Sequence, residues 1–141
     1  MDDPQKLIAA WIEGRIEPAP VARLVGFRLT ACDDGVARVE MDAGAQHHNP
    51  MGSVHGGILC DLADAAMGVA VAATLGEDES FVTLELTARY FRAVRSAHLV
   101  AEGRIVQRGR GVVFAEAAVT DDDGRPIAHF ASTCLLRPAG G

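Results

Sequence analysis

Hydrophobic and polar residues alternate along much of this chain, and the alternation predicts strands. From residues 24 to 31 and from 36 to 42 it flanks Asp34 and Gly35, a pair that readily takes the positive backbone angles of a tight hairpin turn. Residues 81 to 92, FVTLELTARYFR, predict a half-buried strand. Its predicted apolar side consists of Val82, Leu84, Leu86, Ala88 and Tyr90. Further strands are predicted at 98–108, 111–120 and 125–136, and the short connections favour an antiparallel meander.

Two segments have helical periodicity instead. Residues Pro4 to Gly14 carry apolar side chains at helical spacing, with proline near the start and glycine at the stop. The segment from about Gly56 to Leu75 is the only one apolar enough to fill the concave face of a curled sheet. The order helix, hairpin, long apolar helix and strands therefore predicts an α+β fold with an antiparallel sheet around a central helix.

Length and composition set limits on organisation and partners. With 141 residues, 49% of them hydrophobic, we expect an N-terminal helix and linker over residues 1–20, one main domain over 21–137 and a loose tail over 138–141. The start lacks the positive charge of a secretory signal, and the weakly polar run at 65–76 is too short to cross a membrane, so we expect a cytoplasmic protein. A net charge of −6 makes nucleic acid and anionic membranes unexpected partners.

The long apolar helix carries an unusual stripe of acidic and small residues. At 100° per residue, its members fall within roughly 80° of one another. They are Gly57, Asp61, Asp64, Gly68 and Ala72. A carboxylate on such a helix is partly desolvated, which raises its pKa and makes it a better base or nucleophile. The alternatives are that an arginine pairs with the acid or that the stripe is a close-packed dimer seam.

The residues before this helix supply further groups for acyl transfer. Gly56 offers a backbone N–H at a helix start, where an oxyanion is favoured. Asn49 adds an amide and His55 adds an imidazole. Gly56 and Asp64 are eight residues apart, or about 12 Å along a helix, so we expect one site to need both from two packed chains.

Three stretches carry a family resemblance: NPMGSVHGGILCDLADAAMG, TLELTARYFRAV and GRPIAHFASTCLL. In combination they resemble the hotdog-fold acyl-CoA thioesterases, particularly the PaaI-like and 4-hydroxybenzoyl-CoA thioesterase group, over about residues 21 to 137. The resemblance implies a central helix wrapped by a sheet, homodimers whose sheets join edge to edge, and usually a dimer of dimers that forms a homotetramer. It also implies active sites at the dimer interface, with the glycine loop from one subunit and the acid from the other.

The resemblance also implies roles for single residues. Asp64 would be the base or nucleophile, the Gly56 N–H would polarise the thioester carbonyl, Asn49 would orient the thioester or water, and His55 would shape the loop. Asp61 would tune the pKa of Asp64 or bind solvent. We expect the substrate to contact a further set of residues: Gly57, Met51, Asp61, Gly68 and Thr83.

The arginines suggest where the nucleotide end of coenzyme A binds. Six arginines lie between residues 89 and 110 against a single acid, Glu102, and their planar side chains suit phosphate. We favour Arg89, Arg108 and Arg110, although each could be an ordinary solvent-facing strand residue. No metal is expected, and no cofactor other than the coenzyme A of the substrate.

The expected activity is hydrolysis of aromatic or short to medium-chain acyl-CoA thioesters. One alternative is a hotdog hydratase or dehydratase, and another is an acyl-CoA-binding module without turnover. The sequence does not decide the acyl group or the pathway.

Overall fold

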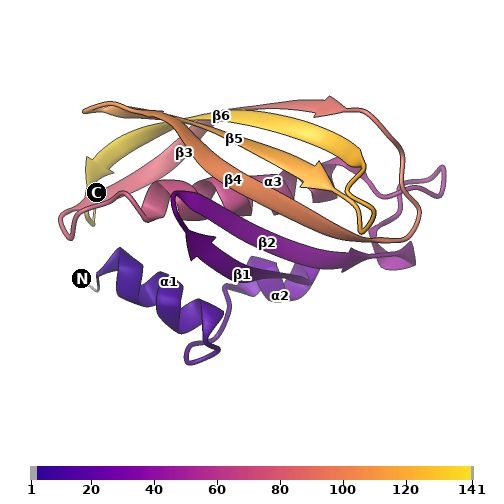
Figure 1. Cartoon of the computed structure of the whole chain (residues 1–141), viewed down its shortest axis with the longest axis horizontal. Coiled ribbons are helices and arrows are strands. Elements are labelled where there is room, and N and C mark those ends of the chain that lie inside the picture. The colour runs from indigo at the N-terminus through magenta and orange to yellow at the C-terminus, as the bar shows by residue number, and fades with distance from the viewer. Residues whose placement is uncertain (1–2, 141) are drawn as a thin grey trace.

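The computed structural model describes residues 3–140, which form a curled antiparallel sheet around a central helix (Figure 1). The helices are α1 (Pro4–Ile12), α2 (Pro20–Val25) and α3 (Gly56–Ala72), with a short 3-10 helix at Ala45–His47. The strands are β1 (Phe27–Asp33), β2 (Val36–Ala43), β3 (Glu79–Tyr90), β4 (Ala97–Arg108), β5 (Val112–Thr120) and β6 (Pro126–Pro138). Their order across the sheet is β1-β2-β4-β5-β6-β3. This arrangement confirms the predicted α+β fold with an extra N-terminal helix.

The predicted hairpin and the two predicted helices are present. Asp34 and Gly35 have φ values of 51° and 76°, as a tight turn between β1 and β2 requires. Helix α1 ends just before Gly14, whose φ is 70°. Leu24, predicted to begin a strand, lies instead in α2, which Pro20 opens and Gly26 closes with a φ of 94°.

Strand β3 lies at an edge of the sheet beside β6, which corrects the predicted meander. Residues 91–96 cross the end of the sheet, so β5 and β6 separate β3 from β4 (Figure 1). Three strand spacings amount to about 14 Å, which six extended residues can span because they reach about 20 Å. The N–H groups of Phe91 and Arg92 donate to the Ile127 carbonyl, at 2.9 and 3.3 Å, and hold the crossing in place.

A bulge in β3 changes which side chains of its first half face the core, contrary to the prediction. The register with β6 shifts between Thr83 and Glu85, so Leu84 interrupts the alternation. Val82 and Leu84, predicted to be buried, are 37% and 58% exposed, whereas Thr83 faces α3. Beyond the bulge the prediction is right, since Leu86 and Ala88 pack against the core.

The core lies between α3 and the concave face of the sheet. Its largest fully buried side chains include Phe130, Met41, Leu62, Met67, Leu99 and Ile127. The sheet approaches the helix closely at Gly103 of β4, where an added Cβ would lie 2.4 Å from the Ala66 carbonyl carbon. Glycine at this position therefore sets the spacing between helix and sheet.

The two ends of the chain are tied to the domain. Ile8 and Trp11 of α1 pack against the core, so the predicted N-terminal segment is not a separate appendage. Residues 1–2 of that segment and residue 141 of the predicted tail lie outside the described residues. The expectation of a loose tail is wrong at its start, because β6 continues to Pro138 and the Ala139 N–H donates to the Asp78 carbonyl at 2.8 Å.

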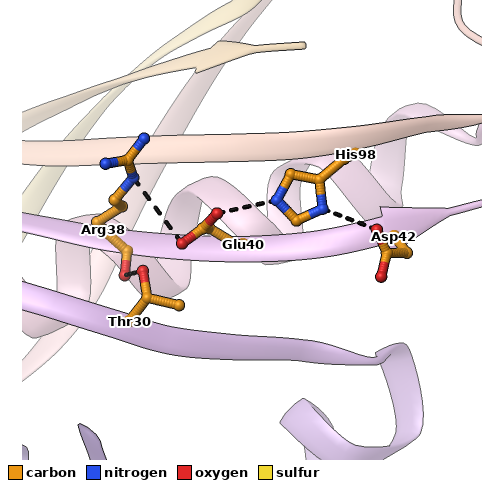
Figure 2. A network of polar contacts seen from close by, with 5 residues as sticks. All are labelled: Thr30, Arg38, Glu40, Asp42 and His98. Atoms are coloured by element: carbon orange, nitrogen blue, oxygen red, sulfur yellow. Dashed lines mark hydrogen bonds and ion pairs between the residues drawn. The ribbon is translucent and has the colours of Figure 1, made fainter. Parts of the chain in front are cut away.

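A polar network crosses the outer face of β2 and β4 (Figure 2). His98 contacts two carboxylates, Asp42 through Nδ1 at 2.7 Å and Glu40 through Nε2 at 2.9 Å. Both ring nitrogens can donate only when the imidazole is protonated. These contacts raise the pKa of His98, with the Glu40 hydrogen bond as the largest cause.

Candidate active site

The predicted stripe is the face of α3 that the sheet leaves uncovered. Leu59, Leu62, Ala63, Ala66 and Met67 are buried against the sheet. The five stripe residues are all at least partly exposed: Gly57, Asp61, Asp64, Gly68 and Ala72. Within residues 3–140, no cationic side chain pairs with either aspartate. The alternative explanation, that an arginine pairs with these acids, therefore does not apply within the described residues.

Asp64 contacts the sheet through one hydrogen bond. The Thr83 hydroxyl donates to Asp64 Oδ1 at 3.2 Å. The β3 bulge matters here because it turns Thr83 toward the helix. Burial raises the pKa of the Asp64 carboxyl and the charge of Asp61 raises it further, whereas the Thr83 hydrogen bond lowers it. Asp64 is thus a half-buried carboxylate with a raised pKa and a hydroxyl partner beside it, which is the environment of a general base or nucleophile.

Asn49 organises the loop that precedes α3. Its side-chain oxygen accepts from the Met51 and Ser53 N–H groups, at 3.0 and 3.2 Å, and its amide nitrogen donates to Ser53 Oγ at 3.1 Å. The Asn49 N–H donates to the Ser53 carbonyl at 2.8 Å, and Gly52 takes a φ of 83° to close the turn. In this chain Asn49 therefore holds a tight loop whose tip, Met51, is 81% exposed.

His55 caps α3 and accepts hydrogen bonds from two of the backbone N–H groups in its first turn. His55 Nδ1 accepts from the Gly57 N–H at 2.9 Å. Gly57 was expected to contact the substrate, but its backbone donor is already in use. The His55 carbonyl accepts from the Ile58 N–H at 2.9 Å. Within residues 3–140 the Gly56 N–H has no acceptor. This N–H is therefore available at the positive end of the helix dipole.

One chain does not bring the donor and the acid together. Gly56 and Asp64 are on one continuous helix, so their backbones are about 12 Å apart along its axis. Gly56 and Asp64 are both partly exposed, so a second chain could approach each of them.

An apolar groove lies beside Asp64 toward the end of α3, with a volume of about 550 Å³. Its floor is Ala65, Gly68, Val69 and Ala72 of α3, and Phe81 of β3 closes one side. Helix α1 forms the other wall through Leu7, Ile8 and Trp11. Gly68 therefore lines the groove, whereas the neighbouring Met67 is fully buried in the core.

The candidate phosphate-binding arginines are not one cluster. Arg108 Nη2 is 2.8 Å from Glu79 Oε1 at the start of β3, and Arg110 lies close by beside a shallow cavity. Arg89 lies ten residues further along the strand, or about 33 Å away. Arg89 is exposed and pairs with His129 of β6. Its side chain lies on the face of the sheet opposite that of Tyr90. Arg89 and Arg108 lie near the ends of β3 and β4, and these long strands run antiparallel, so the two arginines are at opposite ends of the sheet.

The histidines near the loop anchor backbone. His47 is buried, and its Nε2 donates to the Val25 carbonyl at 2.7 Å while Nδ1 accepts from the Gly44 N–H at 3.1 Å. His48 Nε2 lies 2.7 Å from the Arg95 carbonyl oxygen.

Among the described residues no three His, Cys, Asp or Glu side chains are grouped to hold a metal ion. None of the helices in residues 3–140 is long and apolar enough to span a membrane.

Comparison with known families places this geometry in context. The family model of the thioesterase superfamily matches residues 51–128, which hold the loop tip, all of α3 and strands β3 to β5. The chain belongs to the thioesterase superfamily. Its similarity to the proofreading thioesterase EntH of Klebsiella pneumoniae is 31% identity over 135 residues, covering 96% of this chain and 95% of that protein.

Other members of the superfamily resemble this thioesterase over most of their length. A 1,4-dihydroxy-2-naphthoyl-CoA hydrolase of Listeria monocytogenes is 24% identical and covers 80% of this chain and 92% of its own. The crystal structure of a phenylacetic acid degradation-related protein of Ralstonia eutropha JMP134 has a TM-score of 0.82, with 28% identity over 91% of this chain and 98% of that one. Escherichia coli PaaI has a TM-score of 0.81 at 22% identity, covering 99% of this chain and 98% of its own, which shows a shared fold.

Sequence reasoning missed three features of this site. Ser53 was not singled out, although it completes the Asn49 loop. Tyr90 was assigned only to a strand face, yet its hydroxyl donates to the Gly56 carbonyl at 2.9 Å. The contribution of α1 to the apolar groove was also not foreseen. The only signal for Ser53 was its position four residues after Asn49; the other two depend on contacts between distant segments.

Proposed function

We propose that this member of the superfamily hydrolyses acyl-CoA thioesters, with Asp64 as the catalytic base or nucleophile. The observation that carries the proposal is the placement of Asp64: a half-buried carboxylate that has no cationic partner within residues 3–140, receives the Thr83 hydroxyl, and directly precedes Ala65, where an apolar groove begins. A solvated surface aspartate would have none of these three properties.

The chemistry follows from the groups around the acid. Asp64 would take a proton from water as the water attacks the thioester carbon, or would attack that carbon directly to form an acyl-enzyme anhydride. The Gly56 N–H would stabilise the negative charge that develops on the carbonyl oxygen. The released thiolate of coenzyme A is a good leaving group, so donation at the oxygen and activation of the nucleophile supply the main catalytic assistance.

The proposed catalyst is a homodimer with two shared sites. Because Gly56 and Asp64 of one chain are about 12 Å apart, each site would combine the loop of one subunit with Asp64 of its partner. Their exposure on one side of α3 supports such packing, and β3 offers a free sheet edge for pairing. The expectation of a dimer of dimers remains part of this proposal.

The groove supports an apolar acyl group as the part of the substrate that is joined to coenzyme A. From Ala65 to Ala72 it follows the helix for about 10 Å. A volume of about 550 Å³ lies within the range typical of ligand pockets. An aromatic ring or a medium aliphatic chain would bury much more apolar surface in it than an acetyl group would. Arg110 and Arg108, beside the cavity at the start of β3, remain the proposed contacts for the phosphates.

The test is thiol release from a panel of acyl-CoAs by wild type and by Asp64→Asn. Phenylacetyl, hydroxybenzoyl, butyryl and octanoyl esters sample both acyl classes. We expect wild type to hydrolyse at least one ester and the variant to lose about 10²–10⁴-fold in kcat, the range of general base catalysis. Because the charge of Asp64 is desolvated, the variant should melt no lower than wild type. Full activity of Asp64→Asn would refute the role of Asp64.

Two further assays separate the other two functions considered from the sequence. Hydration of crotonyl-CoA without thiol release would indicate a hydratase. Binding of CoA esters without any turnover would indicate a ligand-binding module.

A further inference from the structure

Tyr90 connects the hydrophobic core to the first turn of α3. Its hydroxyl oxygen lies 2.9 Å from the Gly56 carbonyl oxygen and 3.2 Å from Cys60 Sγ. The ring meets Phe130 edge to face, with centroids 6.0 Å apart and planes at 87°, and Phe130 is fully buried. The Tyr90 backbone is also in register with Ala128 of β6. The ring is thus fixed by the sheet while the hydroxyl reaches the loop.

The direction of these hydrogen bonds follows from counting protons. A tyrosine hydroxyl has one proton, and the Gly56 carbonyl can only accept, so Tyr90 donates to Gly56. The Cys60 thiol must then donate to the Tyr90 oxygen. Burial, followed by the Cys60 hydrogen bond, raises the pKa of Tyr90 to about 12, so the hydroxyl keeps its proton across the physiological range.

The Tyr90 bond completes a clamp on one peptide unit. The Gly56 carbonyl and the Gly57 N–H belong to the same planar peptide. Tyr90 holds its oxygen at 2.9 Å, and His55 Nδ1 holds its N–H at 2.9 Å. On the preceding peptide, the Ile58 N–H holds the His55 carbonyl at 2.9 Å. Three of the four polar groups around Gly56 are thereby fixed, and within residues 3–140 the fourth, the Gly56 N–H, has no acceptor.

The contact is also close enough to require glycine. A Cβ added at Gly56 would lie 2.8 Å from the Tyr90 hydroxyl oxygen and 2.9 Å from Cζ of the ring. Glycine is flexible, and two consecutive glycines at a helix start would otherwise allow the N–H to sample several directions. The tyrosine ring therefore both needs the glycine and compensates for its freedom.

We propose that Tyr90 is a positioning residue for thioester hydrolysis: through the Gly56 carbonyl it orients the Gly56 N–H toward the thioester oxygen. The inference rests on the proposed function and adds a residue to that site. Tyr90 acts through the peptide and makes no contact with the reacting atoms.

Steady-state kinetics of Tyr90→Phe test this role. The substitution removes the hydroxyl and keeps the ring, and Tyr90 is 51% exposed, so no buried polar group is orphaned. We expect kcat to fall about tenfold with KM within about twofold, a smaller loss than the 10²–10³-fold of removing an oxyanion donor itself. The matched control is Thr30→Val, which removes a 3.3 Å hydroxyl bond to the Arg38 carbonyl in the β1–β2 hairpin. The control should keep wild-type kinetics.

Two non-hydrolysable analogues separate positioning from a general structural effect. A ketone analogue, in which a methylene replaces the thioester sulfur, keeps the carbonyl; a thioether analogue lacks it. Tyr90→Phe should weaken binding of the ketone about tenfold and leave thioether binding unchanged. Equal loss for both analogues, or no loss for either, would overturn the inference.

The failure of this inference can be told from that of the proposed function. If wild type hydrolyses CoA esters, Asp64→Asn does not, and Tyr90→Phe matches wild type, only the role of Tyr90 is refuted. If wild type hydrolyses no ester of the panel, both proposals are refuted together.

Discussion

The spacing between β4 and α3 gives a sharp test of how the fold positions Asp64. A Cβ at Gly103 would lie 2.4 Å from the carbonyl carbon of Ala66, 2.5 Å from its oxygen and 2.7 Å from the Met67 nitrogen. These are backbone atoms, so no side chain can turn aside. To restore ordinary contact, helix and strand must separate by about 1 Å in a close-packed interior.

The expected cost of Gly103→Ala follows from this clash. Overpacking typically costs about 1–3 kcal/mol, and a backbone obstacle places this variant at the upper end. For a chain of this length, that corresponds to a melting temperature lower by roughly 5–12 °C. Asp64 is two residues from Ala66, so the same displacement should disturb its bond to Thr83, and a 1 Å misplacement can reduce kcat/KM by about 10²-fold.

Urea unfolding and thiol release would be measured on Gly103→Ala and on a matched control, Gly111→Ala. An added Cβ at Gly111 meets no atom within 4 Å, and this residue is exposed. The control should therefore stay within about 0.5 kcal/mol of wild type. A Gly103→Ala protein as stable and active as the control would refute the conclusion that this contact sets the helix position.

Two further predictions concern titratable groups. Thr83→Val removes a hydrogen bond that lowers the pKa of Asp64, so the acidic limb of the kcat/KM profile should move to higher pH; an unmoved limb would contradict the assigned contact. His98 has a raised pKa in the folded state, so its stabilisation is complete below its unfolded pKa of about 6.5 and is lost as pH rises through the folded pKa. Glu40 has a lowered pKa, so its contribution is lost as pH falls through that folded pKa. Urea midpoints should therefore fall as pH rises above about 6.5, and His98→Gln should flatten this decline; an equally steep decline in the variant would assign it to other groups.

Much of the site could be recognised from the sequence because its groups are close together along the chain. The spacing of Asp61, Asp64 and Gly68 fixes their common face on any helix, and the glycines around His55 mark the helix start. The hairpin at Asp34 and Gly35 follows from local backbone preference alone. These features depend on residues within a few positions of one another, so periodicity and turn chemistry determine them.

Tertiary structure decided what depends on distant segments. The β3 bulge that turns Thr83 toward Asp64 reflects pairing with β6, whose residues opposite the bulge, Thr133 and Cys134, are 48 and 51 positions from Glu85 and Thr83. The donation from Tyr90 to Gly56 spans 34 residues, and the groove needs α1 to pack beside α3. The separation of Arg89 from Arg108 likewise comes from the course of antiparallel strands. The sequence alone thus determined which chemical groups the helix carries, whereas long-range packing determined their partners, because side-chain contacts between distant segments have no local signature.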